Sequence, residues 1–244
     1  RHTRYWRDWS SDVCSSDLEA YDSLNHRVLN IHLPWSDQKI YWDAGNSGTS
    51  SFDRLSKSAT AAEYKGYWNY WTFVKNVSTG RLKIYKNGNV YLQATGKNKR
   101  MYGISKIRIG SNLDNNNFYD GNIDDFAIFD TEVSQANIQK FMYKHIDASH
   151  PDYTHLKVYY TFDENQDVNT TVYDNSANGK DGTVFGVPQS TVYDGSEVFK
   201  NFYETNERPQ IIFGQGVYNS SVDSMLVVDS VETSPVSIVL YSDS

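Results

Sequence analysis

The sequence predicts an all-β protein built as an antiparallel β-sandwich, and three observations support this prediction. Aromatic residues make up 15% of the chain, and aromatic side chains favour the pleated, half-buried surfaces of sheets. From residue 27 onward, short segments of alternating apolar and polar residues follow one another, separated by glycine-containing turns. The regular alternation of strands and helices that builds a parallel sheet is missing from the pattern.

The first series of expected strands ends near residue 111. Their sequences are VLNIHL, KIYWDAG, WTFVKN, LKIYKNG, NVYLQATG and KIRIGS. The pair Asn87-Gly88 lies between two of these segments, and it favours a type I′ turn because both central positions of that turn need a positive φ. The sequence therefore predicts a tight hairpin at this pair.

One short helix is expected, from Ser134 to His145. Apolar residues recur there at helical spacing, including Ile138 and Phe141, and Ser134 can cap the N-terminus. After a polar link at residues 147–152, strand-like segments return. They are LKVYYTFDE, PQIIFGQG, SMLVVDSV and VSIVLYS.

The chain divides into four expected parts. Residues 1–18 show no periodicity and contain DWSSDVCSSDL, which resembles translated adapter sequence, so this part is predicted to be non-native or disordered. Residues 19–150 are predicted to form the main sandwich, without the opening strands that would precede Leu24. Residues 151–190 are expected to form a strand and loop segment, and residues 191–244 a β-rich extension or the start of a following domain.

The composition narrows the classes of partner. The formal net charge of −7 argues against nucleic acid, whose binding needs a basic surface. No run of about 18 apolar residues is present, so membrane insertion is not expected. Cys14 is the single cysteine, which excludes an intramolecular disulfide framework and a thiolate zinc site. A surface rich in Asn and Asp is compatible with calcium, which takes oxygen ligands.

Three motifs, in this order, resemble the laminin-G-like, or concanavalin A-like, jelly-roll domains. They are WNYWTFVKNVSTGRLKIYKNG at residues 68–88, IRIGSN at 107–112 and YDGNIDDFAIFDTEVSQANIQKF at 119–141. The segment at residues 156–186 is similar to the one that often opens such a module. The resemblance implies a jelly-roll sandwich with one short terminal helix.

Residues 32–57, HLPWSDQKIYWDAGNSGTSSFDRLSK, are similar to laminin-G-like modules in large secreted proteins of Bacteroidetes-type bacteria. Some of those modules lie beside catalytic domains of the peptide N-glycosidase F type. The similarity implies a secreted or cell-surface location, and it implies that other domains of the same parent chain are partners.

The same resemblance implies a calcium site at the strand GNIDD. In the family the acidic residue of this strand lies near an edge calcium, which makes Asp124 a candidate ligand with Asp120 nearby. Strand alternation is expected to send the adjacent Asp125 to the opposite face. A solvated or hydrogen-bonded structural aspartate is the alternative.

A second calcium candidate is the loop that contains Asp174, Asn178 and Asp181. It is no EF-hand, because Phe185 stands at the twelfth position, where that loop needs a glutamate. The alternative is a plain loop in which Asn and Asp bond to nearby backbone groups.

Trp35, Tyr41 and Trp42 are the candidate carbohydrate-binding residues, since aromatic rings of this kind can stack on sugars. The alternative for each aromatic residue is the core, and Trp68 and Phe73 match core positions of the family.

The sequence predicts a non-catalytic carbohydrate-binding or adhesion module, stabilised by calcium if the candidate sites bind it, within a larger secreted or cell-surface bacterial protein. Glycan or glycoprotein is the expected partner. No catalytic residue is assigned, because no Glu-x-Asp-x-x-Glu, H-E-x-x-H or G-x-S-x-G string occurs. Two alternatives remain: a fragment of a secreted glycoside hydrolase or peptide N-glycosidase, and a structural spacer.

Overall fold

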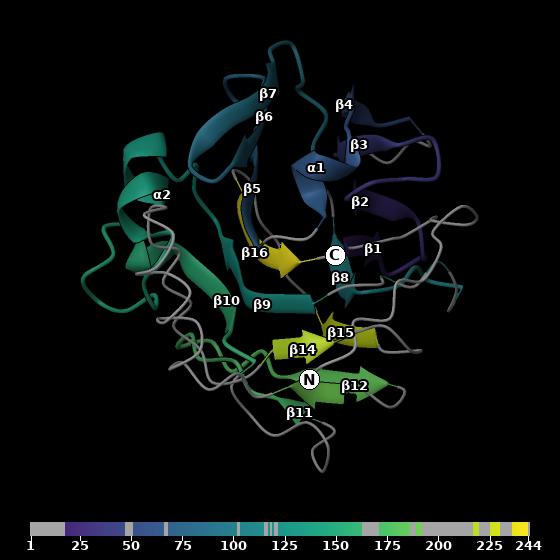
Figure 1. Ribbon diagram of the computed structural model, residues 1–244. Coiled ribbons are helices and arrows are strands. Elements are labelled where there is room, and N and C mark those ends of the chain that lie inside the picture. The colour runs from purple at the N-terminus through teal and green to yellow at the C-terminus, as the bar shows by residue number, and fades with distance from the viewer. Residues whose placement is uncertain are drawn as a thin grey trace, which may run out of the picture.

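The protein is a sandwich of two antiparallel sheets in the computed structural model (Figure 1). The structure describes residues 18–46, 51–65, 68–101, 103–114, 117, 119, 122–162, 171–185, 189–191, 217–219, 225–229 and 236–243. Within these residues the order of the first sheet, sheet A, is β11-β12-β15-β8-β1-β2-β3-β4. The order of sheet B is β13-β14-β9-β16-β5-β6-β7, and β10 also pairs with β9. The predicted all-β antiparallel sandwich is confirmed.

The chain passes back and forth between the two sheets, in runs of one to four consecutive strands. Sheet A contains β1 (Leu18–Asp22), β2 (Arg27–His32), β3 (Lys39–Ala44), β4 (Asp53–Ser58), β8 (Ile104–Ile109), β11 (Thr171–Val172), β12 (Gly182–Phe185) and β15 (Met225–Asp229). Sheet B contains β5 (Asn69–Asn76), β6 (Arg81–Lys86), β7 (Asn89–Ala94), β9 (Asn122–Phe129), β10 (Leu156–Tyr160), β13 (Gln189–Thr191), β14 (Val217–Asn219) and β16 (Val236–Asp243). The helical elements are α1 (Ala61–Tyr64), α2 (Gln135–Phe141) and the 3₁₀ turn η1 (Tyr153–His155).

Aromatic side chains fill much of the space between the sheets. The ring of Phe73 from sheet B lies 5.5 Å from Trp42 of sheet A and 6.3 Å from Trp71, measured between centroids. Phe126 and Tyr160 stack at 5.9 Å. All five are at most 1% exposed, and burial of each such side chain contributes on the order of 1.5–3 kcal/mol. The high aromatic content therefore serves the core first.

Helix α2 covers the outer face of sheet B, where a second apolar cluster lies beneath it. Ser134 caps the helix as predicted, because its hydroxyl accepts a hydrogen bond from the backbone N–H of Asn137 at 3.2 Å. The helix ends at Phe141, four residues before the predicted end. Nδ1 of His145 instead lies 3.1 Å from the Tyr159 hydroxyl, so this part of the chain contacts β10.

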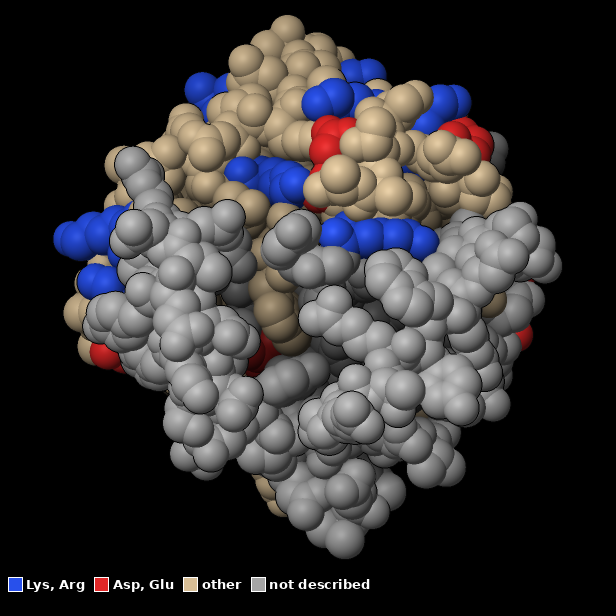
Figure 2. Space-filling model, in the orientation of Figure 1, with Lys and Arg blue, Asp and Glu red and all other residues tan. Residues whose placement is uncertain are grey.

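Helix α1 was not predicted, although its start has a recognisable signal. Thr60 and Glu63 have the spacing of a capping box, and the Thr60 N–H donates to the Glu63 carboxylate at 2.7 Å. Lys86 donates to the backbone oxygen of Glu63, and the Tyr91 hydroxyl donates to its carboxylate at 3.3 Å. Figure 2 shows lysine and arginine side chains around the position that α1 takes in Figure 1.

Within the described residues, no helix is long and apolar enough to cross a membrane.

The two sheets are completed by segments that lie far apart in the sequence. An opening strand does precede Leu24: β1 begins at Leu18, which is 1% exposed, and it lies between β2 and β8. The 151–190 segment supplies β10 and β12, and the 191–244 segment supplies β15 and β16. Strand β16 bonds to β5 and β9 on its two sides, so the last segment is built into the sandwich.

The expectation that Asp124 and Asp125 face opposite sides of the sheet is wrong, because β9 contains a β-bulge at this point. Each aspartate is next to a core residue, so both turn away from the core. Ile123 and Phe126 both lie in the core between the sheets, although strict alternation would place residues three apart on opposite faces. The pairing with β16 shifts by one residue here, and Asp125 has a φ of 51°. The extra residue leaves the Asp125 carboxylate facing Tyr159, whose hydroxyl donates to it at 2.9 Å.

A buried ion pair joins the sheets at one end. The ammonium group of Lys75 on β5 is fully buried and donates to Asp53 of β4 at 2.6 Å and to the backbone oxygen of Lys97 at 2.7 Å. Burial lowers the pKa of Lys75, and the hydrogen bond to Asp53 opposes that change. Each charge of such a pair depends on the other, because an unpaired buried charge is costly.

The predicted hairpin at Asn87-Gly88 is confirmed, because β6 and β7 pair on either side of it and both turn residues have positive φ. The turn also anchors α2. The side-chain amides of Gln135 and Gln139 each donate to the Gly88 carbonyl at 3.0 Å.

We expect Gly88→Ala to lower the free energy of unfolding by about 2–3 kcal/mol. The φ of 75° strains a residue with a Cβ, and that Cβ would lie 2.7 Å from Cγ of Gln139. Gly96→Ala is the matched control, since its φ is 73° but nothing lies within 4 Å of the added carbon. Urea unfolding of the two variants measures the difference, and equal losses would contradict the docking of α2 on this turn.

His150 makes the loop after α2 sensitive to acid. Its ring is 5% exposed and lies 5.3 Å from Phe129 and 4.5 Å from Phe141, and Nδ1 accepts the N–H of Asp152. Burial holds the pKa of His150 below its ordinary value of 6.5, while the carboxylates of Asp152 and Asp147 raise it in part.

We therefore expect His150 to reduce stability below about pH 6.5, because the unfolded chain takes up a proton there and the folded chain resists it. In His150→Phe, the loss of unfolding free energy between about pH 7.5 and about pH 5.5 should be smaller than in the wild type. Denaturant unfolding at both pH values measures this. An equal loss in both proteins would rule out His150 as the source.

Candidate functional site

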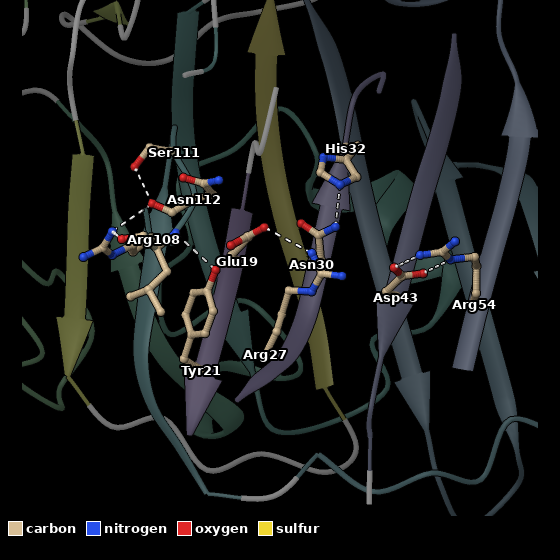
Figure 3. Close-up of polar contacts among 11 residues, drawn as sticks. Glu19, Tyr21, Arg27, Asn30, His32, Asp43, Arg54, Arg108, Ser111 and Asn112 are labelled. Atoms are coloured by element: carbon tan, nitrogen blue, oxygen red, sulfur yellow. Dashed lines mark hydrogen bonds and ion pairs between the residues drawn. The ribbon is translucent and has the colours of Figure 1, made fainter. Parts of the chain in front are cut away.

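A row of polar side chains crosses the outer face of sheet A (Figure 3). Arg108, Glu19, Asn30, Asp43 and Arg54 come from five adjacent strands, β8, β1, β2, β3 and β4, and each is paired directly with the next. In β1, β2, β3 and β8 the residues on either side belong to the core between the sheets, and so does Leu55 next to Arg54 in β4, so alternation turns these five outward. We call these five residues the polar row.

The acidic members of the polar row lie beneath basic side chains. Asp43 is fully buried, and its two oxygens accept hydrogen bonds from Nε and an Nη of Arg54, both at 2.6 Å. The Glu19 side chain is 4% exposed, and an Nη of Arg27 lies 3.5 Å from it. Arg108 donates to the backbone oxygen of Asn112 at 2.8 Å. These contacts fix the row in one geometry, because a two-bond arginine–carboxylate pair constrains both partners.

Asn30, at the centre of the row, is 1% exposed. Its side-chain nitrogen lies 2.5 Å from Nε2 of His32, while its oxygen Oδ1 is buried and accepts no hydrogen bond from the described residues. A buried acceptor without a donor costs about 1–3 kcal/mol.

Three rings lie beside the polar row. The ring of His32 lies 4.3 Å from that of Trp35 and 6.0 Å from that of Tyr41. Tyr41 and Trp35 are half-buried, and the guanidinium of Arg54 lies 4.8 Å from the Tyr41 ring. The Tyr41 hydroxyl donates to Asp37 at 2.6 Å, and this bond is the main cause that raises the pKa of Tyr41. We call His32, Trp35 and Tyr41 the aromatic edge.

The three predicted carbohydrate-binding residues therefore do not share one environment. Trp35 and Tyr41 lie at the surface, and their role stays a prediction. The prediction for Trp42 is wrong, because this side chain is fully buried and its indole N–H points to the backbone oxygen of Val74 at 3.4 Å. Tyr41 and Trp42 are neighbours on one strand, so only one of them can face outward.

The predicted metal-binding loop is organised by its own hydrogen bonds. Oδ1 of Asp174 accepts the backbone N–H groups of Tyr159 and Ser176, and Oδ2 accepts the Ser176 hydroxyl and the Lys180 N–H, at 2.8–2.9 Å. Calcium needs six to eight oxygen ligands at about 2.3–2.6 Å. Because four donors already point at the Asp174 carboxylate, this residue does not fit a calcium ligand and does fit the loop-organising alternative.

The other predicted ligands do not form a cluster with Asp174 in the described structure. Asp181 accepts the Asp174 N–H at 2.8 Å, and the Asn178 amide donates to a backbone oxygen of β10 at 2.9 Å. Asp124 is fully buried in β9, and Asp120 lies outside the described residues. In the part of the chain that the structure describes, no three His, Cys, Asp or Glu side chains gather in a way suited to a metal. Calcium binding stays a prediction.

None of the five residues of the polar row was predicted from the sequence. The signal was present, since alternation within VLNIHL places Asn30 and His32 on one face, and alternation within KIYWDAG places Tyr41 and Asp43 on one face. Alternation within one strand does not show which strands pair with each other. That pairing brings Asn30 and Asp43 together with Glu19.

We expect Asp174→Ala to lower the free energy of unfolding by about 3 kcal/mol, and by the same amount in calcium and in EDTA. Asn175→Ala in the same loop is the control, and it should cost less than about 1 kcal/mol because its side-chain bonds are long, at 3.3 and 3.4 Å. Thermal and urea melts measure both. A loss that disappears in EDTA would instead assign Asp174 to a metal site.

One comparison with known proteins identifies a relationship. A laminin G family model, described as the concanavalin A-like lectin/glucanases superfamily, matches residues 7–139. The matched range contains the whole polar row and the aromatic edge. Comparison with curated proteins and with solved structures gives no significant match.

Proposed function

Since this chain belongs to the concanavalin A-like lectin/glucanases superfamily, we propose that it is a carbohydrate-binding module whose ligand lies on the outer face of sheet A. The observation that carries the proposal is the polar row beside the aromatic edge. Sugars present hydroxyl groups around a ring with apolar C–H faces. A surface that combines placed hydrogen-bonding groups with aromatic rings matches both features.

Rigidity supports this function. The polar row stands on five paired strands rather than on loops, and Asp43 holds Arg54 by two hydrogen bonds of 2.6 Å. Side chains that are already ordered lose little entropy when a ligand binds.

The two carboxylates of the face favour binding over hydrolysis. Glu19 and Asp43 stand two strands apart, which corresponds to roughly 10 Å. Glycosidases do use a pair of carboxyl groups at about 5–10 Å, one of which hands a proton to the leaving oxygen. Both oxygens of Asp43 are taken by Arg54, so it is poorly placed for that step. We therefore place the module outside the catalytic part of any hydrolase.

We further propose that the module works in a larger secreted or cell-surface bacterial protein, where it attaches its parent chain to a glycan or glycoprotein. The similarity of residues 32–57 to modules of secreted bacterial proteins supports this location.

We expect Trp35→Ala and Tyr41→Ala each to weaken glycan binding by at least about tenfold, because each removes a ring from the aromatic edge. Tyr173→Ala is the matched control, since Tyr173 is an aromatic residue that is 52% exposed and lies outside the polar row and the aromatic edge. A glycan array followed by titration with the best ligand measures the effect, and circular dichroism checks the fold.

Two results would contradict the proposal. Unchanged binding in both folded variants would remove the aromatic edge from the site. A wild-type protein that binds no glycan would favour the structural spacer, and release of reducing sugar from a polysaccharide would favour the hydrolase.

A further inference from the structure

In the candidate site the acidic side chains are buried and the arginine side chains are partly exposed. The side chains of Glu19 and Asp43 are 4% and 0% exposed, whereas those of Arg27 and Arg54 are 35% and 50% exposed. The negative groups therefore lie below, and guanidinium groups face the outside of the sheet. Figure 3 shows the guanidinium of Arg27 beside both Glu19 and Asn30, and that of Arg54 on the far side of Asp43.

Among the charged side chains of the polar row and Arg27, basic groups outnumber acidic groups. Arg27, Arg54 and Arg108 carry three positive charges and Glu19 and Asp43 carry two negative charges, so these five groups sum to 3 − 2 = +1. The whole chain has a formal net charge of −7.

Both exposed guanidinium groups are held in place from two sides. Arg27 contacts Glu19 and lies 5.0 Å from the centre of the Phe52 ring. Arg54 bonds to Asp43 and lies 4.8 Å from the centre of the Tyr41 ring. An acid below and a ring beside each guanidinium leave it ordered before any ligand arrives.

Each guanidinium also keeps donors for a ligand. An arginine has five N–H donors. Arg54 directs Nε and one Nη to Asp43, while Arg27 directs one Nη to Glu19 at the longer distance of 3.5 Å. Among the described interactions, the other Nη group of each arginine donates no hydrogen bond. A planar guanidinium with free N–H groups matches the oxygens of a carboxylate or sulfate.

We infer that the ligand of this face is an acidic glycan, in which a carboxylate or sulfate group binds Arg27 or Arg54 while the sugar ring lies against the aromatic edge. This inference rests on the proposed function and names the class of its ligand. A sugar ring that carries an anionic group supplies both contacts at once. Recognition depends on contact rather than on attraction from a distance, because the net charge of the chain repels anions.

The experiment compares four polymers by affinity electrophoresis and titration calorimetry: polygalacturonate and dextran sulfate as acidic probes, with amylose and dextran as neutral ones. The wild type should bind at least one acidic probe about tenfold or more tightly than either neutral polymer. Salt should weaken that binding, because it screens exposed charges. A preference between the two acidic probes identifies the anionic group.

Variants then assign the residues. Arg27→Gln should weaken acidic-probe binding by at least about tenfold, because it removes one exposed guanidinium group. The contact that it breaks with Glu19 is long, at 3.5 Å, so little else should change. Arg54→Gln alone would leave the buried carboxylate of Asp43 without its partner. The double variant Asp43→Asn with Arg54→Gln removes both charges, so it tests the role of Arg54 without leaving a buried unpaired charge. Arg81→Gln is the control, because Arg81 is 44% exposed on β6, pairs with Glu132 and lies in sheet B.

The outcomes separate the inference from the proposed function. If neutral polymers bind as well as acidic ones, and Trp35→Ala or Tyr41→Ala abolishes binding, the acidic class is overturned and the glycan face stands. If Arg81→Gln weakens binding as much as Arg27→Gln, the attraction is general and the inference fails. If no acidic probe binds, the inference fails whatever the array shows.

Discussion

The packing of large aromatic rings between two sheets decides how the rest of this molecule is arranged. Trp42, Trp71 and Phe73 meet in the space between the sheets, and each is almost completely buried. A strand turns successive side chains to opposite faces, so the inward direction of Trp42 sends Tyr41 and Asp43 outward. The same constraint places Asn30 outward. The candidate site is therefore the reverse side of the core packing, and a change of register in one strand would bury the site and expose the core.

The core also depends on strands that are distant in the sequence. Strand β16, near the end of the chain, lies between β5 and β9, and β15 extends sheet A beside β8. Unpaired strand edges expose backbone hydrogen-bonding groups, and these late strands satisfy them. The ion pair of Lys75 and Asp53 adds a polar connection between the sheets. The face with the polar row is thus carried by a scaffold to which most of the described chain contributes.

Oxygen-rich loops illustrate where sequence patterns are ambiguous. Asp174, Asn178 and Asp181 have the composition of a calcium loop and also that of a loop closed by its own hydrogen bonds. The deciding observation is the direction of the donors, because four N–H and O–H groups point at the Asp174 carboxylate. The same difficulty applies to aromatic residues. Tyr41 and Trp42 are adjacent and chemically alike, yet one lies at the surface and the other in the core.

The sequence by itself determined the antiparallel β class, the hairpin at Asn87-Gly88 and the cap of α2 at Ser134, because each follows from local periodicity or from the φ preferences of one or two residues. Only the tertiary structure decided the polar row. Glu19, Asn30, Asp43 and Arg54 lie 35 residues apart from first to last, and hydrogen bonding between strands makes them neighbours. The bulge at Asp125 likewise depends on pairing with β16, more than a hundred residues later. Contacts of this kind arise from strand order and register, which alternation within one strand does not specify.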